Sequence, residues 1–212
     1  EIFLASDVVK SEQMTELIRL GAQVIPYGKP VAKSLGVMKY VKFLKKQIEA
    51  IKPDVFWEIN NLIPAKISNP YGKYVTTVHD AFMMYMPENY VKFYRTYFKR
   101  GLNKTLSCID GIIYNSEDTR GEIEKFFPQA KKVPHFISYC IVEPIAKTTD
   151  VPKGDYFFYV GNVERRKGGD VLLNAYARYR EMGGTYELCF GGKIREDWIQ
   201  EIYEKLMGEI RG

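Results

Sequence analysis

The chain has 212 residues, of which 46% are apolar and 27% charged, as in an ordinary globular protein of one large domain or two small ones. No apolar run approaches the roughly 18 to 20 residues that span a bilayer, and the first residues lack the pattern of a secretory signal peptide. The net charge of +5 falls within residues 1–150, because residues 151–212 hold as many acidic as basic side chains.

Short β-rich runs alternate with amphipathic helical segments, a pattern typical of βαβ units and a mostly parallel sheet. The first part is predicted to contain strand 2–5, helix 11–20 ended by Gly21, strand 22–26, a helix through 37–51 ended by Pro53, and a buried strand at 54–59. Strand 74–78, helix 90–106, strand 111–114, a helix opened by Ser116 and a strand near 132–137 follow. Ser116 suits a helix N-cap, with acidic residues in the next turn.

Residues 139–154 lack periodicity and contain Pro144, Pro152 and Gly154, so we interpret them as a linker. After it we expect strand 156–160, helix 169–182, strand 186–190 and helix 196–207. The predicted fold is α/β, with a Rossmann-like domain at 1–138 and the start of a second one at 155–212. Two βα units cannot bury both faces of a doubly wound sheet, so we expect this second domain to be incomplete.

Four lysines fall within one predicted helix, at Lys39, Lys42, Lys45 and Lys46. A basic first half suits peripheral contact with an anionic membrane surface, or attraction of a phosphorylated acceptor. A solvated helix face is the commoner reason for such a cluster, and the sequence leaves both interpretations open.

Three cysteines, Cys108, Cys140 and Cys189, form no CxxC or Cys/His spacing. Scattered thiols in odd number are typical of a reducing compartment, so we expect reduced side chains that pack in the core and bind no metal. This indicates a cytoplasmic protein, either free or peripheral to the inner face of the membrane. The many tyrosines predict a core with hydroxyl groups at its edges.

His79 directly follows predicted strand 74–78 and precedes Asp80. Ligands of open α/β sheets bind beyond the carboxyl ends of the strands, so His79 stands where a site is expected. A histidine here could donate to a sugar hydroxyl or a phosphate, or act as an acid or base. The alternative is a loop histidine bonded to backbone carbonyls.

A glycine-rich basic loop lies between strand 156–160 and the next helix, and reads Gly161-Asn162-Val163-Glu164-Arg165-Arg166-Lys167-Gly168-Gly169. Glycines let a backbone approach a ligand closely, and three cations beside a helix N-terminus suit a diphosphate. The loop matches neither GxxxxGK[ST] nor GxGxxG, and a solvated basic turn is the alternative.

Other catalytic patterns are missing from the sequence, which contains no GxSxG elbow, no HExxH and no acidic pair of the DxD type. Asp80, Glu88 and Glu164 are single carboxylates in separate predicted loops. Metal-assisted chemistry is therefore disfavoured.

Four segments carry a family resemblance. Pro53-Asp54-Val55 precedes Val78-His79-Asp80 and Pro87-Glu88; residues 110–117 read DGIIYNSE, 132–137 read KVPHFI, and 159–168 read YVGNVERRKG. In this order and spacing, over about residues 50–192, they resemble the family 4 glycosyltransferases, which have the GT-B fold. The chain departs from the family at His135, where Asn is usual, and at Asn162, where Arg is usual.

The resemblance implies retaining transfer of a sugar from a UDP- or GDP-sugar, without metal or other cofactor, in a cleft between two domains. The acceptor would be a saccharide or a lipid-linked molecule, as in surface polysaccharide or glycoconjugate synthesis. The resemblance also implies that His79 is the catalytic histidine of the cleft and that Lys167 contacts the donor phosphates. The remaining expected residues are Arg165, Arg166, Gly161 and Asn162 around the phosphates, and Asp80, Ser116 and Glu88 elsewhere in the cleft.

Two elements of the family are missing from the sequence. Because the chain opens on Glu1 without Met, we expect the family's Gly-rich loop to precede residue 1 and its E-x7-E segment to follow Gly212. We therefore expect these 212 residues alone not to turn over.

Two other classes of function remain open at this point. A non-catalytic nucleotide or sugar binder of the same fold is favoured by Asn162 in place of Arg. A nucleic-acid-binding protein is suggested by the basic first half, but the aromatic residues fall on predicted strands and helix faces instead of alternating with cations in a loop. We therefore expect no nucleic-acid partner.

Overall fold

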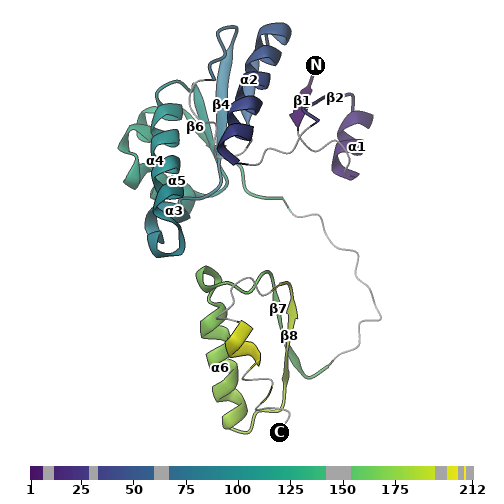
Figure 1. Cartoon of the computed structure of the whole chain (residues 1–212), viewed down its shortest axis with the longest axis vertical. Coiled ribbons are helices and arrows are strands. Elements are labelled where there is room, and N and C mark those ends of the chain that lie inside the picture. The colour runs from purple at the N-terminus through teal and green to yellow at the C-terminus, as the bar shows by residue number, and fades with distance from the viewer. Residues whose placement is uncertain are drawn as a thin grey trace. The chain divides into compact units, whose positions relative to one another are not determined.

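A computed structural model of the chain describes residues 1–6, 12–28, 33–59, 67–141, 154–193, 200–204 and 208. The chain divides into two compact units, Glu1–Ile141 and Val142–Gly212, and each is described by itself (Figure 1). Every strand pair among the described residues is parallel, so the predicted α/β class with parallel sheets is confirmed. Most of the predicted linker, residues 142–153, lies outside the described residues.

The first unit opens with one βαβ element. Strand β1 (Phe3–Ser6) pairs in parallel with β2 (Gln23–Pro26), and α1 (Glu12–Arg19) connects them. Gly21 has φ of +94°, a left-handed conformation that lets the chain leave α1 and turn into β2.

A four-stranded parallel sheet forms the centre of the first unit, in the order β3-β4-β5-β6. Its strands are β3 (Val55–Glu58), β4 (Lys73–Val78), β5 (Gly111–Tyr114) and β6 (His135–Ile137). The helices are α2 (Lys33–Ile51), α3 (Phe82–Tyr85), α4 (Lys92–Leu106) and α5 (Glu117–Phe126), with 3-10 turns η1 (Pro87–Asn89) and η2 (Pro128–Lys132). None of the described helices is both long and apolar enough to cross a bilayer.

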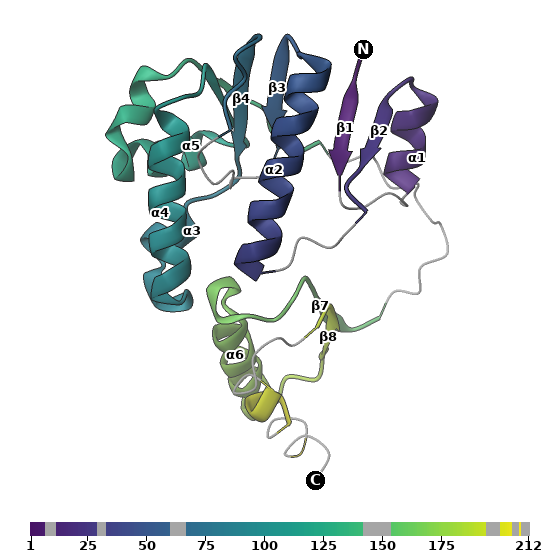
Figure 2. The same ribbon diagram turned by 45° about the horizontal axis from the view of Figure 1, so that its top comes forward.

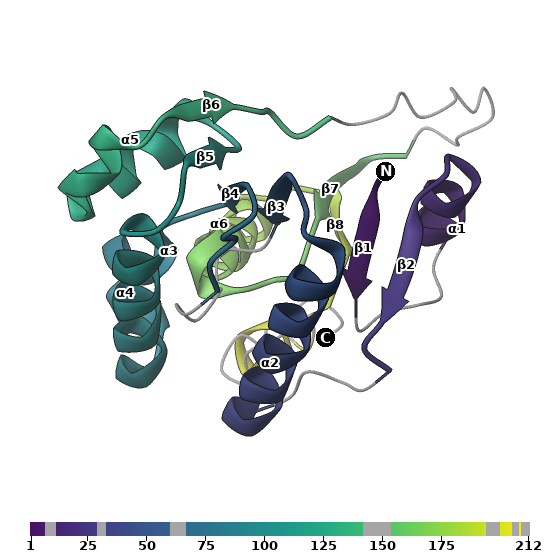
Figure 3. The ribbon, with the colours of Figure 1, turned by 90° about the horizontal axis from the view of Figure 1, so that it is seen from above.

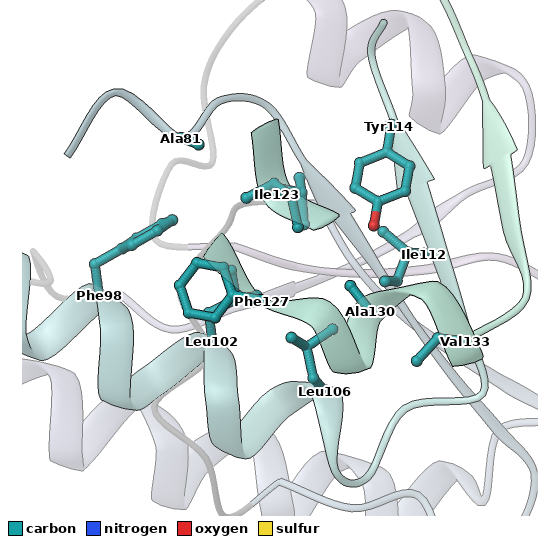
Figure 4. Close-up of a cluster of buried hydrophobic side chains, with 11 residues drawn as sticks. Ala81, Phe98, Leu102, Leu106, Ile112, Tyr114, Ile123, Phe127, Ala130 and Val133 are labelled. Atoms are coloured by element: carbon teal, nitrogen blue, oxygen red, sulfur yellow. The ribbon is translucent and has the colours of Figure 1, made fainter. Parts of the chain in front are cut away.

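The helices cover one face of this sheet. Tyr74, Thr76 and Val78 alternate along β4 and are buried on that face. Leu44 and Ile48 of α2 pack with Tyr74, while α4 and α5 pack around β5 in the cluster that Figure 4 draws. Figures 2 and 3 show α2 and α4 on the same side of the strands.

Among the described residues, the opposite face of the sheet is exposed at its two edge strands, β3 and β6. Val55 and Trp57 on β3 are each 56% exposed, and Phe136 on β6 is 68% exposed. The predicted strand at 54–59 is therefore present as β3, but the prediction that it is buried is wrong. The continuous apolar run suggested cover on both faces, whereas α2 covers only the face to which Phe56 points.

Three further expectations need correction. Strand β6 begins only at His135, because η2 extends to Lys132 and Pro134 has no N–H to donate to a ladder. Cys108 and Cys140 are exposed and Cys189 half-buried, so the thiols do not fill a core. The expectation that tyrosine hydroxyls lie at the edges of the core is not met by Tyr114, which is wholly buried. Its hydroxyl has no hydrogen-bond partner among the described residues, and burial raises its pKa.

The second unit is built on two parallel strands, β7 (Tyr156–Val160) and β8 (Glu187–Gly191). The turn η3 (Arg165–Lys167) and helix α6 (Gly169–Glu181) connect them. Val163 and Leu173 are buried between the helix and the strands. Residues 200–204 are helical, within the helix predicted at 196–207, whose other residues lie mostly outside the described part.

Candidate functional site

A pocket of about 360 Å³ lies at the carboxyl ends of β4 and β5. His79 and Asp80 follow β4, and Asn115 and Ser116 follow β5. Parallel pairing of these strands brings their carboxyl ends to one edge of the sheet, which is why residues 36 positions apart meet. The other lining residues are Ala81, Phe82, Tyr85, Asp118, Thr119 and Glu122.

His79 is exposed, and its ring is held from the neighbouring strand. Its Nε2 lies 2.8 Å from the carbonyl oxygen of Ile59, directly beyond β3. One ring nitrogen of His79 therefore contacts a backbone carbonyl, as expected if His79 is a structural loop histidine. If Nε2 carries the proton, Nδ1 is the acceptor in the neutral ring.

Ser116 is the N-cap of α5, as the sequence predicted. Its hydroxyl oxygen accepts from the backbone N–H of Thr119 at 3.0 Å. The Thr119 hydroxyl lies 2.8 Å from the Asn115 amide oxygen and 3.1 Å from the His79 carbonyl oxygen. This network fixes the first turn of α5 against the end of β4.

Carboxylates give the pocket a negative character. The Asp80 carboxylate accepts from the backbone N–H of Phe82 at 3.1 Å, which holds it at the start of the turn that leads into α3. The pKa of the Tyr85 hydroxyl is raised chiefly by burial. The nearby negative charges of Asp80, Asp118 and Glu122 raise it further. Within the described ranges, no three His, Cys, Asp or Glu side chains come together as a metal site.

Sequence reasoning missed Tyr85, Asp118 and Glu122. The sequence did contain a signal for Asp118 and Glu122. They are four positions apart and so share one face of α5, which starts at the edge of the sheet where a site is expected. Glu88, by contrast, lies exposed in η1 and does not line the pocket. The structure therefore brings together His79, Asp80 and Ser116 but not Glu88.

In the second unit, the predicted basic loop lies at the carboxyl end of β7. Gly161 has φ of +127°, and a Cβ added there would stand 3.5 Å from the ammonium nitrogen of Lys167. Arg166 Nε pairs with Glu164 at 2.8 Å, whereas the side chains of Arg165 and Lys167 are exposed. The N-cap residue of α6 is Gly168, which is in the left-handed region at φ +71° and has no side chain to cap the helix.

Asn162 has a structural role. Its amide oxygen accepts from the backbone N–H of Lys193 at 3.4 Å, and its carbonyl oxygen accepts from the Tyr159 hydroxyl at 3.2 Å. A Cβ on Gly192 would stand 2.0 Å from the carbonyl oxygen of Gly161. The loops after β7 and β8 therefore pack backbone to backbone, which Gly191-Gly192 after a predicted strand could have signalled.

The two units thus offer chemically different surfaces at the carboxyl ends of their strands. The first has an acidic, hydroxyl-lined pocket and the second a cationic turn beside a helix N-terminus. No protein-family model and no curated protein matches the chain.

Proposed function

We propose that the protein is a glycosyltransferase of the GT-B type that transfers a sugar with retention from a nucleoside-diphosphate sugar to a saccharide or lipid-linked acceptor. The observation that carries the proposal is the Lys167 ammonium beside Gly161, at the carboxyl end of β7, in the turn that leads into α6. A helix N-terminus and a neighbouring cation together suit the phosphates of the donor.

The charges of the two units support a division of roles. Three carboxylates in the first unit, Asp80, Asp118 and Glu122, would repel a diphosphate but can accept hydrogen bonds from sugar hydroxyls. The cationic turn of the second unit has the opposite preference. We assign the first pocket to sugar hydroxyls and the second surface to the donor diphosphate.

In the proposed reaction the bond between the sugar carbon and the diphosphate oxygen breaks, and negative charge develops on the departing phosphate. A bond from the acceptor hydroxyl oxygen to the same sugar carbon forms on the same face, and the hydroxyl proton passes to the departing phosphate. Lys167, assisted by Arg165 and the amides of the first turn of α6, would stabilise that charge. Arg166 is held by Glu164 and so serves this role less directly. His79, oriented by the Ile59 carbonyl, would contact the transferred sugar.

A non-catalytic nucleotide or sugar binder is the second candidate. It is favoured by Asn162, which stands where the family has Arg and whose amide oxygen is engaged by the Lys193 backbone. A charge-assisted contact to phosphate is missing at that position. Hydrolysis of the donor distinguishes a catalyst from a binder.

Titration calorimetry of the chain with UDP and with GDP tests the proposal. We expect at least one to bind, and Lys167→Ala to weaken binding about ten-fold or more, because a hydrogen bond to a charged group is lost. Arg178→Ala removes an exposed cation from the last turn of α6 and should leave binding unchanged. Failure of both nucleotides to bind, or equal losses in the two variants, would contradict the proposal.

A further inference from the structure

Helix α4 exposes an apolar tip and a cationic flank, which together we call the α4 surface. The tip consists of Val91, Phe93 and Tyr94, which are 66%, 68% and 57% exposed. The rings of Phe93 and Tyr94 contact each other edge to face at 5.7 Å between centroids. The flank consists of exposed cations further along the helix and beside the tip: Lys92, Lys99, Arg100 and Lys104.

No negative charge offsets these cations within the helix. The sequence of α4, KFYRTYFKRGLNKTL, contains no acidic residue. Among the described residues, none of the four flank cations forms an ion pair, whereas Lys73, Arg120 and Lys125 elsewhere in the unit all do. The buried side of the same helix is apolar, with Phe98 and Leu102 in the core, so the helix itself is firmly anchored.

The α4 surface belongs to a larger basic layer. Helices α2 and α4 cover the same face of the sheet, and α2 exposes Lys39, Lys42, Lys45 and Lys46 (Figure 3). Both helices run antiparallel to the strands, so their N-terminal ends lie toward the edge that carries the pocket. Met38, near the start of α2, is 69% exposed. Apolar side chains thus stand at one end of the layer and cations along it.

We propose that the α4 surface docks on an anionic lipid bilayer, with the tip in the headgroup region and the flank on lipid phosphates. An exposed apolar cluster beside Lys and Arg on one helix is typical of interfacial membrane contact. Charge complementarity favours an anionic bilayer over a neutral one. An aliphatic side chain at the tip favours lipid over a nucleic acid, since Val91 cannot stack on a base.

Docking in this manner also bears on the pocket. Helix α3, which lines the pocket with Phe82 and Tyr85, contacts α4 directly. A bilayer at the tip would therefore lie close to the wall of the pocket, where a lipid-linked molecule could reach it. The docking itself requires neither the donor nor the proposed transfer, so the two proposals can fail separately.

Flotation of the whole chain with vesicles tests the docking. One set of vesicles contains phosphatidylcholine alone and the other an equal mixture with phosphatidylglycerol. We expect binding to the mixed vesicles only, weakened by salt. The pair Lys99→Glu and Arg100→Glu should weaken it by more than ten-fold, since each surface cation contributes roughly five-fold. The pair Phe93→Ser and Tyr94→Ser should also weaken it, without changing the charge.

The matched control is the pair Lys131→Glu and Lys132→Glu, two exposed cations of η2 that change the net charge equally. This pair should bind vesicles nearly as the parent does, and circular dichroism should show all variants folded. Absence of vesicle binding, equal losses in the control pair, or retained binding in both α4 pairs would overturn the proposal. So would binding of single-stranded DNA that is lost in the α4 pairs while vesicle binding persists.

Discussion

The hydroxyl of Thr119 on α5 lies 3.1 Å from the carbonyl oxygen of His79 and joins the end of β4 to the helix that follows β5. Thr119 is buried, and its backbone N–H donates to Ser116. The same residue therefore closes the first turn of α5 and positions the backbone of the candidate cleft histidine.

Replacing Thr119 by Val should destabilise the first unit by about 1–3 kcal/mol, because the buried hydroxyl that joins the part-buried oxygens of His79 and Asn115 to Ser116 is lost. Urea unfolding measures this loss. Thr96→Val is the control, since the Thr96 hydroxyl makes an exposed bond to Lys92 within α4, and we expect a change within about 0.5 kcal/mol. Equal effects of the two substitutions would refute a special role for Thr119.

Ser116→Ala should cost about 1 kcal/mol, since it removes the N-cap of α5. Ser116→Asp should restore most of that stability, because its carboxylate accepts the same N–H and opposes the helix dipole. Thermal unfolding of the three proteins tests this order. If Asp proves no better than Ala, capping is not the role of Ser116.

Much of the fold could be predicted because its signals are local. Strand β5, helix α5 and the Ser116 cap follow from a short apolar run, a capping residue and acids in the first turn. The meeting of His79 with Ser116 also follows, since parallel neighbours bring their carboxyl ends together. These expectations need no knowledge of distant contacts.

What could not be predicted depends on contacts between distant segments. Trp57 is apolar in sequence but exposed, because burial depends on which face the helices cover. Glu88 lies in one of the segments that resemble the glycosyltransferase pattern, yet its place in η1 leaves it outside the pocket lining. The need for glycine at position 192 arises from Gly161, on the neighbouring strand's loop.

Gly192→Ala should destabilise the second unit by about 3 kcal/mol, because its Cβ would stand 2.0 Å from the Gly161 carbonyl oxygen and backbone must move. Amide hydrogen exchange in β7 and β8 measures this unit separately from the first. Gly101→Ala in α4 adds the same methyl group where nothing lies within 4 Å, and should stabilise the first unit by up to about 1 kcal/mol. Unchanged exchange in Gly192→Ala would contradict the close backbone contact.

Asp110 should contribute stability that depends on pH. Its carboxylate accepts from the Lys73 ammonium at 2.8 Å and from the backbone N–H of Tyr74 at 3.0 Å, and these bonds lower its pKa below 3.8. A depressed folded-state pKa gives stability that is present above the unfolded value and is lost as pH falls through the folded value. Asp110→Asn should therefore be less stable than the parent at neutral pH and converge with it in acid.

The control for Asp110 is Asp54→Asn, a change of the exposed carboxylate that directly precedes β3. Urea unfolding at several pH values should show no comparable convergence for this variant. A constant difference between Asp110→Asn and the parent down to pH values well below 3.8 would rule out the linkage.

Lys167→Ala should lower the rate of glycosyl transfer about 100-fold in an active preparation that carries this sequence, as expected for loss of one preorganised transition-state donor. The loss should appear in both KM and kcat, because the ammonium contacts the diphosphate of the bound donor and meets more charge on it in the transition state. Lys167→Arg keeps the charge but not its position beside Gly161, so it should recover only part of the rate. Arg178→Ala is the control, and kinetics of Lys167→Ala that match it would remove Lys167 from the site.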